Sequence, residues 1–223
     1  MCGRFTVRTA PRVKLDGVRD SDLPFTASYN IAPTQEILVI ADFGNGLELT
    51  KLVWGLIPAR SSDGKRFINA RAETIETKPS FNESFRLRRC LILADGFFEW
   101  KRSGKSKRPY YIRMTDESHF AFAGIWDSWG QEQTRTCAIV TTVTNETLEP
   151  IHNRMPVIVP PESYRLWLDP RTDLNSLRKL LVPYPAATMS ANPVSRAVNS
   201  AQNNGPELID REDSEIGTTL SLF

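Results

Sequence analysis

Residues 90–100, Cys-Leu-Ile-Leu-Ala-Asp-Gly-Phe-Phe-Glu-Trp, carry the clearest signal of the fold class. They contain two short runs of β-forming residues, 90–94 and 97–100. Similar runs recur on both sides, at residues 37–41, 47–54, 109–113, 120–126, 136–143 and 155–159. Many short strands of this kind predict a mainly antiparallel, barrel-like β core.

Helical patterns are fewer. Residues 79–89 begin with a proline suited to the first turn of a helix, residues 161–168 follow another proline, and residues 173–181 place leucines at helical spacing. Strands and helices do not alternate regularly, which favours an α+β fold over a parallel α/β fold. We therefore expect several helices that flank the β core.

The length of 223 residues fits a single domain, because 15 prolines and 12 glycines are spread along the chain and do not gather into a linker. We assign residues 1–204 to this domain and residues 205–223 to an acidic C-terminal tail, either poorly ordered or folded back on the body. The tail has five acids and one arginine, so the first 204 residues carry 27 basic and 21 acidic side chains, a net charge of +6. Such a body tolerates a polyanionic partner, although a solvated charged face explains the charge equally well.

The composition argues against several classes of protein. No apolar run approaches the roughly 18 residues of a membrane helix, and the opening residues lack the pattern of a secretory signal, so we expect a cytoplasmic protein with no membrane partner. Three widely spaced cysteines without a C-x-x-C pair, and only two histidines, predict neither disulfides nor a metal site. We expect no cofactor and a monomer.

Cys2 is the most reactive candidate, because loss of Met1 would leave a terminal residue with both an amine and a thiol. An α-amine has a pKa of about 7.7–8.0 against about 10.4 for lysine, so it is the better nucleophile toward an aldehyde at neutral pH. The imine so formed would lie beside the thiol, which could close a thiazolidine ring intramolecularly. The alternative is a Cys2 that packs as a small apolar side chain.

Seven strings of residues occur in order along nearly the whole chain. They are MCGRF at 1–5, YNIAP at 29–33, WGLIP at 54–58, INARAET at 68–74, ADGFFEW at 94–100 preceded by Arg89-Cys90, IHNRMP at 151–156 and NPVSRAV at 192–198. Each string is weakly specific, but together they resemble the SOS response-associated peptidase (SRAP) family. This family includes the abasic-site processing proteins of bacteria and animals.

The resemblance implies that Cys2, exposed by loss of Met1, attacks the ring-opened aldehyde of an abasic site in single-stranded DNA and forms a thiazolidine crosslink. It also implies that Asn69 orients the reacting end, that Glu99 shuttles protons, and that His152 assists sugar ring opening and crosslink reversal. A turn-forming asparagine, an exposed strand glutamate and a structural histidine are the alternatives for these three residues.

Glu99 suits the proton-transfer role because imine formation expels water from a carbinolamine and so needs an acid. Phe97, Phe98 and Trp100 surround it in the sequence, and partial burial among them would raise the pKa of its carboxyl. In a strand, Phe97 and Glu99 would share one face while Phe98 and Trp100 share the other.

Three arginines are candidates for DNA binding. Arg4, Arg71 and Arg154 each lie two residues beyond a candidate catalytic residue, a spacing that in a strand puts both side chains on one face. They would converge on the phosphates that flank the reacting sugar, while a surface salt bridge is the alternative for each. The resemblance adds three residues to the DNA cleft: Asn30, Arg196 and Pro33, the last as a wedge against a flanking base.

One departure from the family pattern concerns base stacking. Some members carry a tryptophan pair after the W-G-x-x-P string, whereas here Pro58 is followed by Ala59 and Arg60. Stacking on an aromatic side chain contributes roughly 1–3 kcal/mol per base. Phosphate contacts from Arg60, Lys65 and Arg66 are the expected compensation.

Two other functions compete with DNA crosslinking. The family name suggests a thiol peptidase with Cys2 as nucleophile, His152 as base and Glu99 as orienting residue, whose activity could be limited to self-removal of Met1. The other is a DNA-binding module without any reaction, in which Cys2 has no chemical role. The imine predicted for crosslinking is also the intermediate of abasic-site lyase chemistry.

Overall fold

The computed structural model describes residues 2–11, 13, 15–19, 23–104 and 106–212. The strands are β1 (Arg4–Val7), β2 (Ser28–Ile31), β3 (Glu36–Asp42), β4 (Leu47–Trp54), β5 (Asn69–Arg71), β6 (Arg89–Ala94), β7 (Gly96–Ser103), β8 (Ser106–Met114), β9 (Phe120–Trp129), β10 (Thr134–Val143), β11 (Arg154–Pro156), β12 (Ile158–Val159) and β13 (Met189–Pro193). The α-helices are α1 (Asn82–Leu87), α2 (Tyr164–Leu168) and α3 (Leu174–Leu180). Short 3-10 helices are η1 (Ala72–Thr74), η2 (Pro161–Ser163), η3 (Ala186–Thr188), η4 (Arg196–Asn199) and η5 (Pro206–Ile209).

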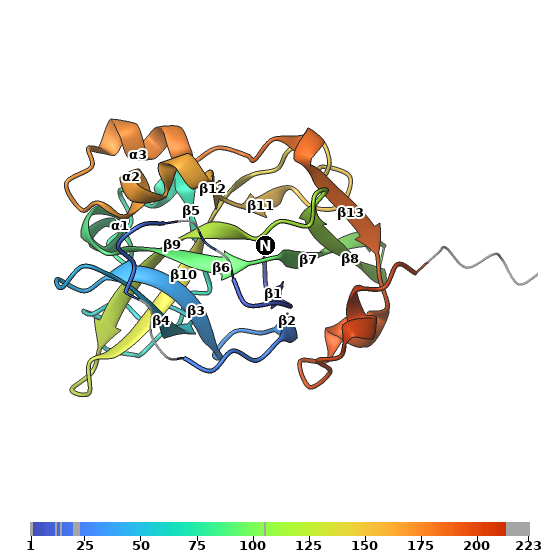
Figure 1. The fold of residues 1–223 in the computed structure, drawn as a ribbon, viewed down its shortest axis with the longest axis horizontal. Helices are drawn as coiled ribbons and strands as arrows, with labels where there is room; N and C mark the ends of the chain where they lie inside the picture. The colour runs from blue at the N-terminus through green and yellow to red at the C-terminus, as the bar shows by residue number, and fades with distance from the viewer. Residues whose placement is uncertain (1, 12, 14, 20–22, 105, 213–223) are drawn as a thin grey trace, which may run out of the picture.

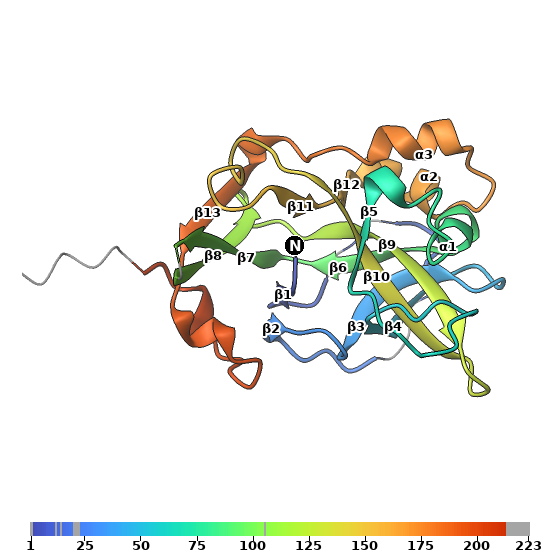
Figure 2. The same cartoon turned by 180° about the vertical axis from the view of Figure 1, so that it is seen from behind.

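Five of the strands close into a barrel (Figures 1 and 2). The strands pair in the order β10-β4-β3-β6-β9, and β9 pairs back with β10. All of these pairs are antiparallel except β4 with β10. Gly44 and Gly46 allow the tight β3–β4 connection, since both have positive φ and both donate to the Asp42 carboxylate.

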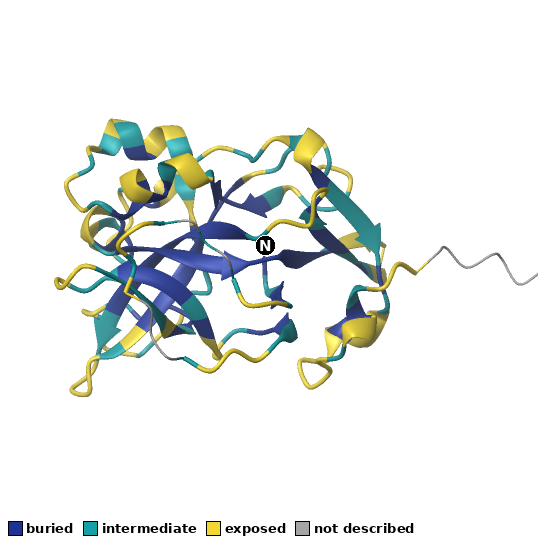
Figure 3. Ribbon diagram, viewed as in Figure 1, coloured by how far each residue is buried: buried dark blue, intermediate teal, exposed yellow. Residues whose placement is uncertain are grey.

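A second sheet, of order β13-β8-β7-β1-β2, packs against the barrel and places β1 between β2 and β7. The Phe5 ring of β1 makes edge contacts with Trp54 at 5.2 Å and with Phe122 at 5.8 Å, both from barrel strands. Figure 3 shows that residues of the central strands are buried and that most exposed residues lie in the loops. The N-terminal strand is therefore part of the core.

The helices cover another face of the barrel. Trp167 of α2 and Phe85 of α1 are fully buried there, and their rings lie 6.1 Å apart. Arg89, at the start of β6, is 3% exposed and donates to the carbonyls of Phe85 and Trp167 at 2.7 and 2.5 Å. This arginine ties both helices to the barrel. No helix within the described residues is long and apolar enough to cross a membrane.

The structure confirms the predicted α+β class, with a mainly antiparallel barrel and flanking helices in one domain. Two of the differences from the predicted boundaries have a direct cause in the hydrogen bonding. Helix α1 begins at Asn82 instead of residue 79, because the amides of Phe81 and Asn82 both bond to Lys78 O in a preceding turn. The predicted strand 155–159 is split at Val157, since β11 pairs with β10 and β12 pairs with β9.

The first part of the predicted tail contacts the body. Leu208 in η5 is fully buried against Val194 and Val198, and Arg211 forms a β-bridge with Val194. The end of the predicted tail, residues 213–223, lies outside the described residues, as does Met1. The proposed removal of Met1 is therefore a chemical expectation about a residue that the structure does not describe.

Candidate active site

Cys2 lies two residues before the start of β1, and its side chain is fully buried between the two sheets. Its backbone carbonyl accepts a 2.9 Å hydrogen bond from Asn69 Nδ2, and its Sγ lies 3.8 Å from the carbonyl oxygen of Arg4. Burial raises the pKa of the thiol far above its usual range, and the charge of Glu99 raises it further. The sulfur is therefore held as a neutral thiol within electrostatic reach of Glu99.

Glu99 lies on β7, which pairs antiparallel with β1. Arg4 is opposite Phe98 in this pair, so the beginning of β1 lies beside Glu99. Glu99 is only 1% exposed, and burial raises the pKa of its carboxyl above the usual range. The predicted burial of this carboxyl is confirmed.

The alternation along β7 decides which side Glu99 faces. Phe97 packs in the same core cluster as Cys2, with its ring 5.9 Å from that of Phe122. Phe98 points to the other face, where its ring lies 5.1 Å from that of Tyr111. The predicted alternation is confirmed, and it places Glu99 on the side of Cys2.

Asn69 begins β5, which is held in place by parallel pairing with β10, where Asn69 is opposite Ile139. Its Nδ2 donates to the Cys2 carbonyl, while its Oδ1 is buried and has no hydrogen-bond partner among the described residues. A buried acceptor without a donor costs about 1–3 kcal/mol, so this amide oxygen is suited to accept a hydrogen bond from a group that arrives next to Cys2.

A cavity of about 490 Å³ opens beside Glu99 and His152. Its lining residues are Glu99, Trp100, Arg102, Lys107, His152 and Asn199. His152 Nδ1 accepts a 3.0 Å hydrogen bond from the Arg154 amide, which leaves Nε2 as the protonated nitrogen of the neutral ring. Burial lowers the pKa of His152, and the positive charges of Arg102 and Arg154 lower it further, so the ring is neutral at neutral pH.

The structure thus brings Asn69 and Glu99 together at Cys2, and it places His152 on the wall of the cavity that Glu99 lines. The four residues come from β5, β7, the chain start and the segment before β11, which are far apart in the sequence.

Arg154 has an intramolecular partner. Its guanidinium forms a bidentate pair with Glu73 at 2.6 and 2.9 Å and also donates to Thr141 O at 2.7 Å. These bonds lower the pKa of Glu73. The salt bridge is therefore what the structure shows for Arg154, and a DNA contact of this residue stays a prediction that requires an exchange of partners.

Arg4 and Asn30 are engaged with the loop that follows β13. Arg4 Nη1 donates to Asn30 Oδ1 at 2.9 Å and to Val198 O at 2.8 Å. Asn30 is 2% exposed, and its Nδ2 lies within hydrogen-bond distance of the carbonyls of Val198, Ser200 and Asn203. Both side chains hold this loop, and their predicted DNA contacts stay predictions.

The other predicted DNA-binding residues are more accessible. Arg71 is exposed on β5, two residues after Asn69. Arg196 donates to Ser106 Oγ at 3.1 Å, which places it beside the β7–β8 hairpin. Pro33 is half-buried, just before Thr34, whose φ of 75° marks a turn. The contacts of these three residues with DNA stay predictions.

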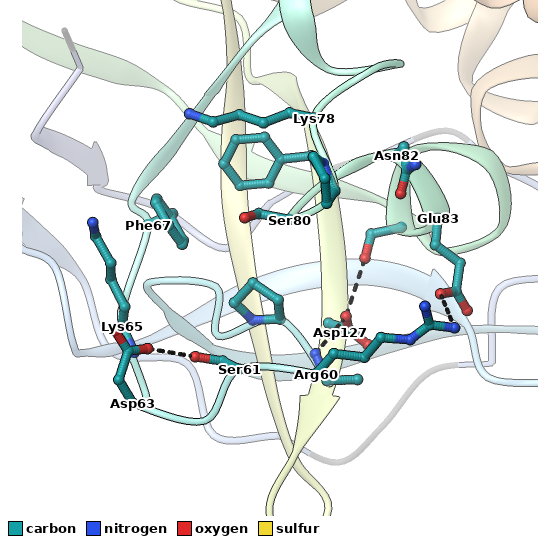
Figure 4. A pocket seen from close by; sticks show the side chains of 15 residues that line it. Arg60, Ser61, Asp63, Lys65, Phe67, Lys78, Ser80, Asn82, Glu83 and Asp127 are labelled. Atoms are coloured by element: carbon teal, nitrogen blue, oxygen red, sulfur yellow. Dashed lines mark hydrogen bonds and ion pairs between the residues drawn. The ribbon is translucent and has the colours of Figure 1, made fainter.

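Figure 4 shows a second hollow, of about 560 Å³, lined by residues of segments 58–67 and 78–84 and by Asp127. Arg60 and Lys65, expected to compensate for the missing tryptophans, both line it. Arg60 Nη2 lies 3.9 Å from Glu83, and Lys65 Nζ lies 5.5 Å from the centre of the Phe67 ring. This hollow is separate from the cavity at Glu99 and His152.

Several residues of the cavity had not been predicted. The Trp100 indole donates to Asn199 Oδ1 at 2.7 Å and so closes one side. Arg102 and Lys107 form part of the wall. A signal for these two cations was present in the sequence, as a run rich in lysine and arginine at residues 101–108.

The fold and the site define a class of protein: a single-domain barrel whose N-terminal strand buries Cys2 beside a carboxyl of raised pKa and an unsatisfied amide oxygen. The chain belongs to the SRAP family, because the family model described as SOS response associated peptidase matches residues 1–201. The resemblance deduced from the seven strings is thereby confirmed.

Individual relatives agree with this assignment. The chain is 45% identical over 222 residues to the abasic site processing protein YoqW of Bacillus subtilis, which covers 94% of this chain and 99% of the relative. It is 44% identical over 225 residues to YoaM of the same organism, also called an abasic site processing protein, with 96% and 99% covered. A crystal structure of a Bacteroides thetaiotaomicron protein is similar at a TM-score of 0.74 and 32% identity, covering 83% of this chain and 85% of that one.

Proposed function

We propose that this protein responds to DNA damage by binding abasic sites in single-stranded DNA and capturing them covalently through Cys2 after loss of Met1. The names of its relatives support abasic sites as the substrate. The observation that carries the chemistry is the arrangement of Asn69 and Glu99 at Cys2: one side chain holds the Cys2 backbone and offers a vacant acceptor, and the other offers a buried acid.

The reaction starts at nitrogen. The Cys2 amine, freed by hydrolysis of the Met1–Cys2 peptide bond, attacks the aldehyde carbon of the open sugar and gives a carbinolamine. Asn69 Oδ1 accepts a hydrogen bond from this amine and orients it. Protonated Glu99 then gives its proton to the carbinolamine hydroxyl, which leaves as water, and the resulting iminium returns its N–H proton to the Glu99 carboxylate to give the imine.

Ring closure follows at sulfur. The Cys2 sulfur attacks the imine carbon, the thiol proton passes to the imine nitrogen, and a thiazolidine results. His152 acts earlier, since its neutral ring can exchange a proton with the sugar hydroxyl that is released on ring opening. The same imine is the intermediate of a lyase reaction, which we propose only as a side reaction.

The raised pKa of the Cys2 thiol favours this order over thiol peptidase chemistry. A peptidase needs a thiolate as its first nucleophile, and burial makes that ion costly here. His152 Nδ1 is bonded to the Arg154 amide, and we propose for its ring a role at the sugar rather than as the base of a peptidase dyad. Amine attack does not need a thiolate in its first step.

We propose that the protein contacts the DNA at its phosphates and not at a base, because an abasic site has no base. Arg71 is the first candidate because it is exposed beside Asn69 on β5. Arg154 would exchange Glu73 for a phosphate, and Pro33 and Arg196 would line the cleft. Arg4 would act near the DNA while it holds the loop at Val198.

The test is adduct formation with a single-stranded oligonucleotide that contains one uracil and has been treated with uracil-DNA glycosylase. The parent protein should give an adduct that survives SDS, and Cys2→Ala should give none. Cys90→Ala is the matched control, because it also removes a fully buried thiol but lies on β6. Absence of an adduct with the parent, or an equal adduct with Cys2→Ala, would refute the proposal.

A further inference from the structure

The hairpin formed by β7 and β8 carries a concentrated positive charge. Residues 101–108 read Lys-Arg-Ser-Gly-Lys-Ser-Lys-Arg, which puts five basic residues in eight positions. The hairpin continues directly from Glu99, two residues before the run begins. Short runs of this composition are typical of surfaces that bind nucleic acid.

The strand register places like charges opposite each other. Arg102 is the cross-strand partner of Lys107, and Lys101 is the partner of Arg108. Like charges directly opposite each other in an antiparallel pair are destabilising. Each of these two pairs costs stability, and a phosphate bound at a pair would offset the cost of that pair.

No acidic side chain among the described residues neutralises this hairpin. Arg108 donates only to the backbone carbonyl of Glu212, and no carboxylate of the described chain lies within ion-pair distance of Lys101, Arg102 or Lys107. Arg154, by contrast, forms a bidentate pair with Glu73.

Two of these cations reach the candidate active site. Arg102 and Lys107 line the cavity of about 490 Å³ that also contains Glu99 and His152. Both side chains are exposed. The positive charge of Arg102 contributes to the lowered pKa of the His152 ring.

We propose that the β7–β8 hairpin binds the phosphate backbone of the DNA strand on one side of the abasic nucleotide, with Arg102 and Lys107 as the contacts nearest the reacting sugar. This inference rests on the proposed function and names part of its binding surface. Binding energy at an abasic site must come from the backbone, because the missing base offers neither stacking nor hydrogen bonds. Two flexible cations at the cavity wall supply such contacts without regard to sequence.

Salt dependence gives the expected size of the effect. On single strands, each phosphate contact contributes about 0.7 to the slope of log affinity against log salt concentration. Loss of Arg102 and Lys107 should therefore reduce the slope by about 1.4, and it should weaken binding similarly for all sequences.

The experiment compares Arg102→Gln/Lys107→Gln with the control Lys51→Gln/Lys179→Gln. Both double variants lose two positive charges, and the control lysines are exposed on β4 and α3, outside the cavity. The probe is a single strand with a tetrahydrofuran analogue, which lacks the aldehyde and so binds without reacting. We expect the hairpin variant to bind several-fold more weakly than the control, with the smaller salt slope.

Two further measurements sharpen the result. Trimming the oligonucleotide one nucleotide at a time from the flank that contacts the hairpin should reduce the affinity of the parent to that of the variant, whereas trimming the other flank should affect both proteins alike. With a reactive abasic strand at a concentration below saturation, adduct formation by the hairpin variant should be several-fold slower than that by the control variant, in parallel with the loss of affinity.

Equal affinity and slope for the hairpin and control variants would overturn the inference. This outcome differs from failure of the proposed function, in which the parent binds the tetrahydrofuran strand but forms no adduct with a reactive abasic site. The noncovalent measurement therefore decides the role of the hairpin whichever way the crosslinking assay turns out.

Discussion

Asp95 anchors the strand that carries Cys2, and its replacement by asparagine should destabilise the protein measurably. The carboxylate lies in the turn between β6 and β7 and is 1% exposed. It accepts hydrogen bonds from Thr6 Oγ1 at 2.5 Å and from the Arg8 amide at 2.6 Å, and Arg8 Nε lies 3.3 Å away. All three contacts hold β1 and the residues that follow it.

The magnitude follows from what an amide can and cannot replace. In Asp95→Asn, Oδ1 can accept from the Arg8 amide and Nδ2 can donate to the Thr6 hydroxyl, so no polar group is left unsatisfied. Two charge-assisted bonds become neutral at a cost of about 1 kcal/mol each, and the ion pair with Arg8 is lost at up to about 1 kcal/mol. We expect a loss of about 2–3 kcal/mol, which for a chain of this size lowers the Tm by roughly 5–10 °C.

The assay is chemical and thermal denaturation, with amide exchange of Arg8 as a local readout. Glu117→Gln is the control, because it removes a carboxylate that pairs with Arg113 at 3.2 Å but is 61% exposed, and it should cost less than about 1 kcal/mol. Asp95→Ala should cost more than Asp95→Asn, since it leaves the Arg8 amide without an acceptor. A loss below about 1 kcal/mol for Asp95→Asn would refute the anchoring role.

Three further predictions concern chemistry and packing. Glu99→Gln should slow adduct formation on the order of 10²-fold or more while leaving noncovalent DNA affinity unchanged, and an equal loss of both would assign Glu99 to binding instead. Because burial raises the pKa of Glu99, the folded protein retains its proton at a pH where the unfolded chain has lost it, so stability falls as the pH rises through this interval. The adduct rate of the parent should decline at high pH as Glu99 ionises, whereas the rate of Glu99→Gln should not decline. The variant should also have a higher Tm than the parent at neutral pH. A variant with the pH profile and Tm of the parent would contradict the role of Glu99 as the acid. Gly96→Ala should destabilise by about 1–3 kcal/mol in denaturant titrations, because its Cβ would clash with the ring and hydroxyl of buried Tyr111, and wild-type stability would show that the backbone at this position can shift. An uncleaved N-terminal extension should abolish adduct formation even with the Cys2 thiol intact, since it acylates the amine; an adduct of the extended protein, seen by mass spectrometry, would contradict amine-first attack.

The sequence predicted most of the barrel because the barrel strands are mostly long and rich in β-branched and other apolar residues. Strand β4 has the predicted limits of 47–54, and β6, β9 and β10 extend the predicted runs by one to three residues. Strands β1, β2, β5 and β13 were not predicted, since they have three to five residues and mix polar with apolar side chains. Their extended conformation comes from pairing with distant strands and not from local preference.

The chemistry of the candidate site could also be predicted in part from the sequence. An amine and a thiol on one residue lie within reach of each other in any fold, and the alternation of Phe97, Phe98 and Trp100 around Glu99 predicted the burial that raises the pKa of its carboxyl. Neighbours in the chain supplied this information, so the sequence determined which groups could react.

The partners of the charged side chains were decided only by the tertiary structure. Arg154 pairs with Glu73 across 81 positions, and Arg4 bonds to Val198 across 194. A guanidinium two residues from a catalytic group can face DNA or a carboxylate, and the choice depends on which side chains packing brings within about 3 Å. The tertiary structure also decided the like-charged pairs of the β7–β8 hairpin, because only the strand register places Arg102 opposite Lys107 at the edge of the cavity.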